Sequence, residues 1–227
     1  MSHRSLIVRA VILAAVWCLL AAAVVGFGYL LTHPWRTEVN GVDHPVARWF
    51  ADQREPGLDP VAEAGTFLGE TIVGVTVTVL VACGFALWWR SWRPVVFVVV
   101  VEAGLGGFYW LGTHADPRQR PPVRILDQGL VPDASYPSGH VATATVAAGA
   151  VVGLTWLSTR VARWWVLPVL ALPALTLLSR LYEGAHNLTD VLTSLVYAGV
   201  WVAAVAALVL PGDRAAPDRD LRGPAGA

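Results

Sequence analysis

The chain has 227 residues, of which 56% are hydrophobic and 14% are charged, and its mean hydropathy is +0.57. Soluble domains carry about a quarter charged residues, so this composition excludes an ordinary soluble domain and indicates a membrane protein. The formal net charge is zero, which gives no basis for nucleic-acid binding. The two cysteines, Cys18 and Cys83, lie in apolar segments without metal-ligand spacing, and we expect neither a disulfide nor a metal site from them.

Six apolar segments approach or reach the length of roughly 20 residues that a transmembrane helix needs. The first segment is too long for the core of a signal peptide, and we interpret it as a retained helix. The sequence therefore predicts an all-α fold, an integral membrane bundle of six transmembrane helices. The predicted spans are residues 10–31, 67–89, 94–111, 141–157, 164–178 and 188–210.

The predicted spans divide the chain into three segments. Residues 1–65 contain the first helix and an outer polar stretch, in which residues 46–50 are expected to form an amphipathic helix on the membrane surface. Residues 66–210 contain the other five helices. Residues 211–227 are rich in charged residues, alanine and proline, and we expect a disordered cytoplasmic tail. Four tryptophans are predicted to lie at the membrane interface, namely Trp35, Trp49, Trp110 and Trp201.

The arginines predict an orientation, because cytoplasmic loops carry an excess of positive residues. All sixteen basic residues are arginine. The short connections at residues 90–93 and 158–163 carry arginine and no acid, and the C-terminal tail carries further arginines. We therefore expect a multi-pass cell-membrane protein with both termini in the cytoplasm, and residues 33–65, 112–139 and 179–187 on the outer side.

Residues suited to binding a phosphate lie in two of these outer segments. Ser138 and Gly139 precede a predicted helix, whose free N–H groups bind anions, and glycine lets an anion approach closely. Ser138 is also a good helix cap, and capping alone is the plainer interpretation of this step. Arg120 and Arg180 carry planar guanidinium groups that match phosphate oxygens. Together these four residues predict a phosphate-binding site.

Two histidines in the same segments are candidate catalytic groups. His186 and Asp190 are four residues apart at the start of the last predicted span, so they share a helix face. A carboxylate beside an imidazole fixes its tautomer and leaves the other ring nitrogen free to attack. We predict His186 as the nucleophile, Asp190 as its support and His140 as the general acid. The first two also have the spacing of two metal ligands, and that alternative stays open here.

These residues resemble the type-2 phosphatidic acid phosphatase family, or lipid phosphate phosphatases, whose superfamily includes vanadate-dependent haloperoxidases. The family motif Pro-Ser-Gly-His is intact at residues 137–140. The resemblance covers roughly residues 66–210 and implies a phosphatase core that needs no metal or other cofactor. A second family motif, Ser-Arg, then His after five residues and Asp after three more, is intact at Ser179, Arg180, His186 and Asp190.

The resemblance implies a reaction as well as a fold. A phosphomonoester or pyrophosphate on a membrane lipid would be hydrolysed through a phosphohistidine at His186, and vanadate would inhibit. Arg120, Arg180, Ser138 and the Gly139 amide would bind the phosphoryl group. Polyprenyl pyrophosphate, phosphatidic acid and phosphatidylglycerol phosphate are the expected substrates, presented by the lipid bilayer. No nucleic-acid or protein partner is expected.

The first family motif, Lys followed after six residues by Arg-Pro, departs from the pattern. Arg120 fits its end, but Thr113 stands at the lysine position, and the chain contains no lysine. Loss of one charged phosphate contact costs on the order of 1.5–3 kcal/mol. The predicted compensating cations are Arg118, Arg124 and His114.

Two other functions stay open. A phosphotransferase would pass the phosphate from His186 to another acceptor. A lipid-binding protein with a degenerate site would use the same groove without catalysis, and Thr113 is the feature that favours it.

Glu102 lies near the middle of the third predicted span. Ionisable residues inside a membrane are expensive and are functional by default. Structural pairing with another helix and contact with the substrate are equally expected for this carboxyl group.

Overall fold

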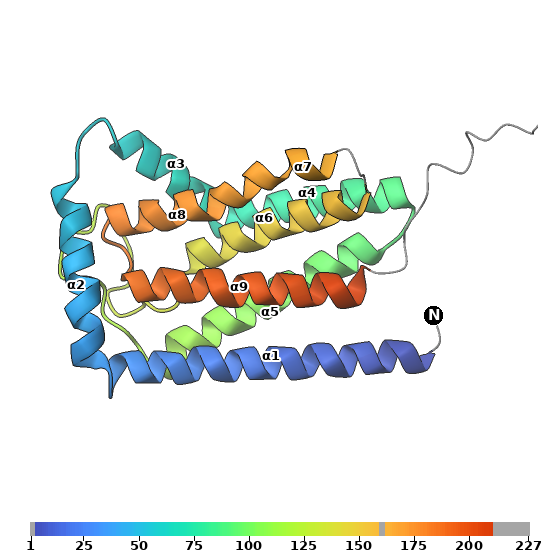
Figure 1. Ribbon diagram of the computed structural model, residues 1–227, viewed down its shortest axis with the longest axis horizontal. Coiled ribbons are helices and arrows are strands. Elements are labelled where there is room, and N and C mark those ends of the chain that lie inside the picture. Colours follow the sequence, from blue (N-terminus) through green and yellow to red (C-terminus); the bar gives the residue numbers. More distant parts are fainter. Residues whose placement is uncertain (1–2, 159–161, 211–227) are drawn as a thin grey trace, which may run out of the picture.

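The computed structural model describes residues 3–158 and 162–210, and every named element in that part of the chain is a helix (Figure 1). The predicted all-α fold class is therefore confirmed. The predicted disordered tail, residues 211–227, lies outside the described residues. In chain order the elements are α1 (His3–Thr32), α2 (Arg36–Asp52), α3 (Asp59–Gly69), α4 (Thr71–Trp89), α5 (Arg93–Ala115), α6 (Gly139–Ser158), α7 (Ala162–Trp165), η1 (Leu167–Leu170), α8 (Ala171–Tyr182) and α9 (Leu188–Val209).

Five of the described helices, α1, α4, α5, α6 and α9, are long and apolar enough to cross a membrane. The predicted span at 164–178 corresponds to a shorter apolar stretch, Leu167–Tyr182. Proline explains the shortening, because Pro168 lies in the first turn of η1 and Pro173 in the first turn of α8, where a missing N–H is tolerated but a continuing helix is not. The protein is thus a multi-pass membrane protein, and the sixth span remains a prediction.

Two predicted boundaries differ from the structure. The predicted span 67–89 is interrupted at Glu70, whose ψ of 135° separates α3 from α4. The apolar run continues through this break, so hydropathy alone does not reveal it. The predicted span 94–111 continues to Ala115, because polar residues at its end remain helical.

The outer polar stretch contains more helix than the short amphipathic segment predicted at 46–50. Both α2 and α3 lie there, and α2 runs across the end of the bundle (Figure 1). Figure 1 shows the loop after α5, the turn between α8 and α9 and the start of α6 at this same end, opposite the N-terminus. The two segments that carry the family motifs therefore meet at one end of the bundle.

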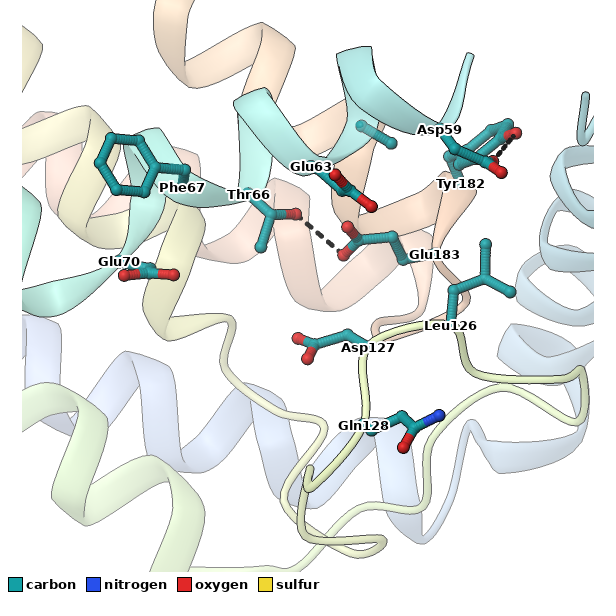
Figure 2. A pocket seen from close by; sticks show the side chains of 11 residues that line it. Asp59, Glu63, Thr66, Phe67, Glu70, Leu126, Asp127, Gln128, Tyr182 and Glu183 are labelled. Atoms are coloured by element: carbon teal, nitrogen blue, oxygen red, sulfur yellow. Dashed lines mark hydrogen bonds between the residues drawn. The ribbon is translucent and has the colours of Figure 1, made fainter. Parts of the chain in front are cut away.

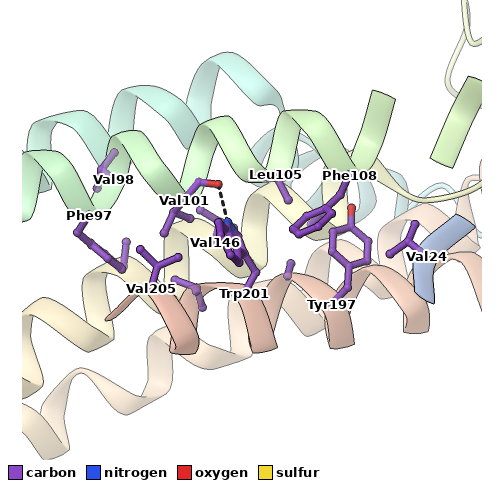
Figure 3. Close-up of a cluster of buried hydrophobic side chains, with 14 of the residues drawn as sticks. Val24, Phe97, Val98, Val101, Leu105, Phe108, Val146, Tyr197, Trp201 and Val205 are labelled. Atoms are coloured by element: carbon purple, nitrogen blue, oxygen red, sulfur yellow. Dashed lines mark hydrogen bonds between the residues drawn. The ribbon is translucent and has the colours of Figure 1, made fainter. Parts of the chain in front are cut away.

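The main core lies between α1, α5, α6 and α9 (Figure 3). Phe108 packs against Trp17, Tyr197 and Trp201 with ring centroids 5.4–5.6 Å apart. The indole N–H of Trp201 donates to the carbonyl of Val101 at 3.1 Å. Trp201 is 2% exposed, so its predicted place at the membrane interface is wrong, whereas Trp35, Trp49 and Trp110 are exposed. The α1 residues Ala21, Val24 and Leu31 belong to the same core.

Close approach of α5 and α9 depends on Gly104, where an added Cβ would lie 2.5 Å from the Trp201 ring. We expect Gly104→Ala to destabilise the bundle by about 1–3 kcal/mol, because the new methyl group overlaps a buried side chain. Thermal unfolding in detergent, followed by tryptophan fluorescence, measures the change. The control is Gly84→Ala, since nothing lies within 4 Å of its Cβ position and both changes gain similar helix propensity. Equal melting temperatures for the two variants would contradict this packing.

Candidate active site

A cavity of about 310 Å³ lies where the loop 116–138 and the turn 183–187 meet α4, α5 and α6, at the end of the bundle opposite the N-terminus. Its lining brings together Arg120, His140 and His186, which the sequence predicted for chemistry, with Gly139 beside them. The other lining residues come from α4, α5, α6 and the loop, namely Thr71, Val75, Glu102, Leu105, Gly106, Tyr109, Leu130, Ala134, Ala142 and Thr143.

His186 lies in the turn between α8 and α9 and is 4% exposed. Its Nδ1 is 2.7 Å from the backbone carbonyl oxygen of Ser135, which can only accept a hydrogen bond. Nδ1 therefore carries the proton, and Nε2 keeps the lone pair that a nucleophile needs. Gly184 shapes the turn with a φ of 71°, and a Cβ there would lie 2.8 Å from Val123. Only glycine fits this position without strain.

The surroundings of His186 favour its neutral form. Burial lowers the pKa of this imidazole well below its ordinary value of 6.5, and the positive charges of Arg180 and Arg120 lower it further. The hydrogen bond to Ser135 opposes this shift but does not cancel it. At neutral pH the side chain is therefore an uncharged base with one free nitrogen, the state required for attack on phosphorus.

The predicted direct contact between Asp190 and His186 is wrong, because the carboxylate acts through Ser135. Its Oδ2 accepts the Ser135 hydroxyl at 2.6 Å and the backbone N–H of Asn187 at 2.8 Å. Asp190 is the third residue of α9 and Asn187 is its N-cap, so the short side chain folds back onto the free N–H groups of its own helix. The carboxylate thus fixes Ser135, whose carbonyl in turn orients the imidazole.

Arg118, predicted as a compensating cation for phosphate, is instead buried between two carboxylates. Its Nη2 lies 2.7 Å from Asp43 Oδ2, and its Nη1 donates to Asp190 Oδ1. The arginine side chain is 5% exposed, and both carboxylates are 0% exposed. Thr189 completes the group, because its N–H and hydroxyl both donate to Asp43. With both terminal nitrogens paired to these carboxylates, Arg118 is not available to a phosphate.

Asp43 is a residue that the sequence analysis missed. It stands alone in the polar stretch 33–65, with no motif or spacing to distinguish it from the other acids there. Its importance depends on the path of α2 across the end of the bundle, which brings it to Arg118 and Thr189. No signal in this single sequence identifies that contact.

Arg120 links the loop 116–138 to the turn 183–187 by hydrogen bonds, close to the histidines. Its Nε donates to the carbonyl of Val131 at 2.8 Å, and its Nη2 donates to that of Ala134 at 3.0 Å. Its Nη1 donates to the carbonyl of Ala185, next to His186. Carbonyl dipoles hold the guanidinium in place without neutralising it, so its full positive charge remains available to an anion in the cavity.

Arg180 is fully buried and is held by acids on one side. Its Nη1 lies 2.7 Å from Glu183 Oε2, and its Nη2 lies 2.8 Å from Asp127 Oδ2. Its Nε is buried and has no hydrogen-bond partner in the described part of the chain. A buried donor without a partner costs about 1–3 kcal/mol of stability, and the Nε–H of Arg180 is such a donor.

The acids that hold Arg180 also line a second pocket, of about 420 Å³ (Figure 2). Figure 2 shows Glu63, Asp127 and Glu183 turned into the same space, with Thr66 bonded to Glu183. A phosphate dianion is repelled by so many carboxylates. The smaller cavity with the two histidines is therefore the better site for an anionic substrate.

The start of α6 is built as predicted in one respect. The Ser138 hydroxyl oxygen accepts the Val141 N–H at 3.5 Å and so caps the helix. Its side chain is 0% exposed, and its own N–H donates to the Ser194 hydroxyl at 2.8 Å. Ser138 thus orders the turn that carries Gly139 and His140 into the cavity, and it is not itself among the described lining residues.

The lysine position of the first family motif is not filled by a nearby cation. The Thr113 hydroxyl donates to the carbonyl of Tyr109 in its own helix at 2.9 Å. Arg124 is exposed, and His114 stacks on Trp110. None of these residues is among the described residues that line the cavity. With Arg118 paired elsewhere, neither predicted arginine compensates for the lysine in this structure.

Comparisons with known proteins agree with the fold and the motifs. A family model described as the PAP2 superfamily matches residues 91–211, more than half of the chain. The fold is similar to the crystal structure of the first transmembrane PAP2 type phosphatidylglycerolphosphate phosphatase from Bacillus subtilis. The TM-score is 0.65 at 20% identity, and the likeness covers 87% of this chain and 94% of that one. No curated protein matches the chain significantly.

The buried group of Asp43, Arg118 and Asp190 predicts a large stability effect. We expect Arg118→Met to destabilise the fold by about 3–5 kcal/mol, because it leaves two buried carboxylates without their cation. Thermal unfolding in detergent measures this. Arg124→Met, an exposed arginine in the same loop, is the control and is expected to unfold like the wild type. If the two variants unfold at the same temperature, the ion pairs do not stabilise the fold.

The lowered pKa of His186 predicts a pH effect on stability. Because its pKa in the folded state lies below 6.5, the unfolded chain takes up a proton first as pH falls. This contribution to stability is therefore fully present above pH 6.5 and declines below it. His186→Gln lacks the group, so its melting temperature should fall less steeply between about pH 7 and about pH 5. Parallel profiles for variant and wild type would show that His186 is not buried in its neutral form.

Proposed function

The chain belongs to the PAP2 superfamily, and on that premise we propose that it is a phosphatase that acts on a membrane lipid. The reaction is hydrolysis of a phosphomonoester or of a pyrophosphate. The observation that carries this proposal is the presence of His186, His140 and Arg120 in one cavity, with a free Nε2 on the buried histidine. A neutral imidazole nucleophile, a second imidazole and a fixed cation are the groups that phosphoryl transfer through histidine requires.

The proposed reaction has two steps. In the first, Nε2 of His186 attacks phosphorus, the bond to the lipid or diphosphate leaving oxygen breaks, and His140, which begins the cycle as the imidazolium, gives that oxygen a proton. In the second, water attacks the phosphohistidine, His140 takes a proton from the water, and inorganic phosphate leaves with His186 restored. Each step moves one proton through His140, so the catalyst returns to its starting state without a metal.

Stabilisation of the transferring group comes from fixed positive charge. Arg120 lines the cavity, and Arg180 lies close enough to lower the pKa of His186 by its charge. Because these groups are already held by carbonyls and carboxylates, little reorganisation is needed as charge builds up on the equatorial oxygens. The Gly139 amide adds a donor at the start of α6.

A lipid is the substrate class that fits the position of the cavity. Part of the cavity lining comes from helices that are long and apolar enough to cross a membrane. These helices contribute the apolar residues Val75, Leu105 and Ala142. Phosphatidic acid, phosphatidylglycerol phosphate and polyprenyl pyrophosphate all combine a phosphate head with an apolar chain. With cytoplasmic termini, as the arginines predict, the cavity opens on the outer face of the cell membrane.

One observation favours a second function. Thr113 replaces the family lysine, and its hydroxyl is bonded within its own helix. A lipid-binding protein that has lost catalysis would keep the cavity and the arginines without turnover.

We expect purified protein in detergent to release inorganic phosphate from at least one of the three lipids, with EDTA present. His186→Ala should abolish release because it removes the nucleophile, and His140→Asn should lower the rate by about 10²–10⁴-fold through loss of the general acid. Vanadate should inhibit, because it mimics the pentacoordinate phosphoryl group. His114→Ala, an exposed histidine outside the cavity, is the control and is expected to keep wild-type activity.

Three results would contradict the proposal. Release that persists in His186→Ala would exclude this nucleophile. Vanadate binding by folded wild-type protein that releases no phosphate from any of the lipids would favour the non-catalytic function. Release that appears only when an alcohol acceptor is supplied, with no free phosphate, would identify a phosphotransferase.

A further inference from the structure

The cavity continues past the histidines into the membrane part of the bundle, where it reaches Glu102. Tyr109, Gly106 and Glu102 line it from one face of α5, at spacings of three and four residues. Tyr109 marks the outer end, because its ring lies 3.1 Å from the position of an added Cβ on Gly139. With a rise of about 1.5 Å per residue, Glu102 lies roughly 10 Å deeper along α5 than Tyr109.

The side chain of Glu102 accepts a hydrogen bond from the neighbouring helix α4. The hydroxyl of Thr78, a buried residue of α4, donates to Glu102 Oε1 at 2.8 Å. This is the one hydrogen bond that the described residues make to this carboxyl group. The neighbouring lining residues Val75, Leu105 and Ala142 are apolar. A polar group therefore faces a largely apolar part of the cavity, and its Oε2 has no hydrogen-bond partner among the described residues.

The chemistry of the group selects its ligand. A carboxyl group in apolar surroundings costs least free energy as the neutral acid, which has one O–H donor besides its acceptor oxygen. The Thr78 hydroxyl already occupies the acceptor Oε1. The remaining O–H requires an acceptor, and an ester carbonyl is an acceptor that brings no competing donor.

We propose that Glu102 is a specificity-determining residue that donates a hydrogen bond to an ester carbonyl oxygen of a glycerophospholipid substrate. This inference rests on the proposed function, since it places the phosphate at His186 and His140. The chains of a lipid held there run along the cavity toward Glu102, and the ester carbonyls are the first acceptors that follow the phosphate. A polyprenyl chain has no acceptor at that depth, so it leaves the O–H of Glu102 without a partner.

The test compares two lipids that differ only in the proposed acceptor. They are dioleoyl phosphatidic acid, with two ester carbonyls, and its di-O-oleyl ether analogue, which has none. The measured quantity is the ratio of kcat/KM for ester over ether in the same mixed micelles, for wild type, Glu102→Leu and Glu102→Gln. The ratio is internal to each protein, so a general loss of activity in a variant does not change it. Glu63→Leu, an exposed acid of α3 outside this cavity, is the control.

We expect the wild type and the control to prefer the ester by about three- to tenfold, the value of one hydrogen bond. Glu102→Leu should bring the ratio close to one, and Glu102→Gln, which keeps a donor, should retain most of the preference. Equal rates on both lipids in the wild type, or an unchanged ratio in Glu102→Leu, would overturn the inference and leave Glu102 as a structural partner of Thr78. If the leucine variant does not fold, the wild-type ratio and the glutamine variant still decide.

Failure of the proposed function would look different. Wild-type protein would then release phosphate from neither of these lipids, and from neither phosphatidylglycerol phosphate nor polyprenyl pyrophosphate. Binding of the same two lipids, measured with His186→Ala protein by displacement of a fluorescent phospholipid, supplies the ester-to-ether ratio without turnover. A ratio of one in that measurement overturns the role of Glu102, and a ratio above one that disappears when Glu102→Leu is added supports it.

Discussion

The pairing of Arg118 with two buried carboxylates is the interaction on which the candidate active site depends. Asp43 and Asp190 are both 0% exposed, and each would be costly to bury without a cation between them. The arginine joins α2, the loop after α5 and the start of α9, and the hydrogen bonds from Thr189 to Asp43 and from Ser135 to Asp190 connect the same three parts. Because one oxygen of Asp190 faces Arg118, the other is left to hold Ser135 and Asn187. The position of the His186 imidazole therefore follows from an ion pair that lies outside the described lining of the cavity.

Arg118 and Arg120 have different electrostatic roles in this arrangement. The two buried carboxylates neutralise the charge of Arg118. Arg120 is held by neutral carbonyls, so its positive charge is not neutralised next to the cavity. Burial and the nearby arginines together keep His186 neutral, since they oppose a proton more strongly than the Ser135 carbonyl favours one. The same positive charges that would attract an anion to the cavity thus also favour the neutral form of His186. An acid close to the imidazole would weaken both effects, and in this structure Asp190 contacts it only through Ser135.

The sequence predicted those features that depend on short spacing or on composition. Hydropathy located five spans, the intact motifs located His140 and His186, and the partly matching first motif located Arg120, because helix starts and adjacent loop residues are local properties. It did not predict Asp43, whose partner Arg118 lies 75 positions away, or Ser135, 51 positions from His186, since long-range pairing leaves no local pattern. The sequence predicts Arg118 as a phosphate-binding cation, because sequence alone does not distinguish a loop arginine that faces a ligand from one that pairs with a buried acid. The helix break at Glu70 was missed because the apolar run continues across it.

Arg180 and Arg120 differ in how directly their charge is presented to the cavity. The two terminal nitrogens of Arg180 are paired with Glu183 and Asp127, which cancels much of its charge on that side, yet its buried Nε lacks a partner in the described residues. Arg180 is not among the described residues that line the cavity, and its charge acts there through its effect on His186. With Thr113 in place of the family lysine, Arg120 is the one arginine among the described lining residues, and Arg180 adds its positive charge at longer range.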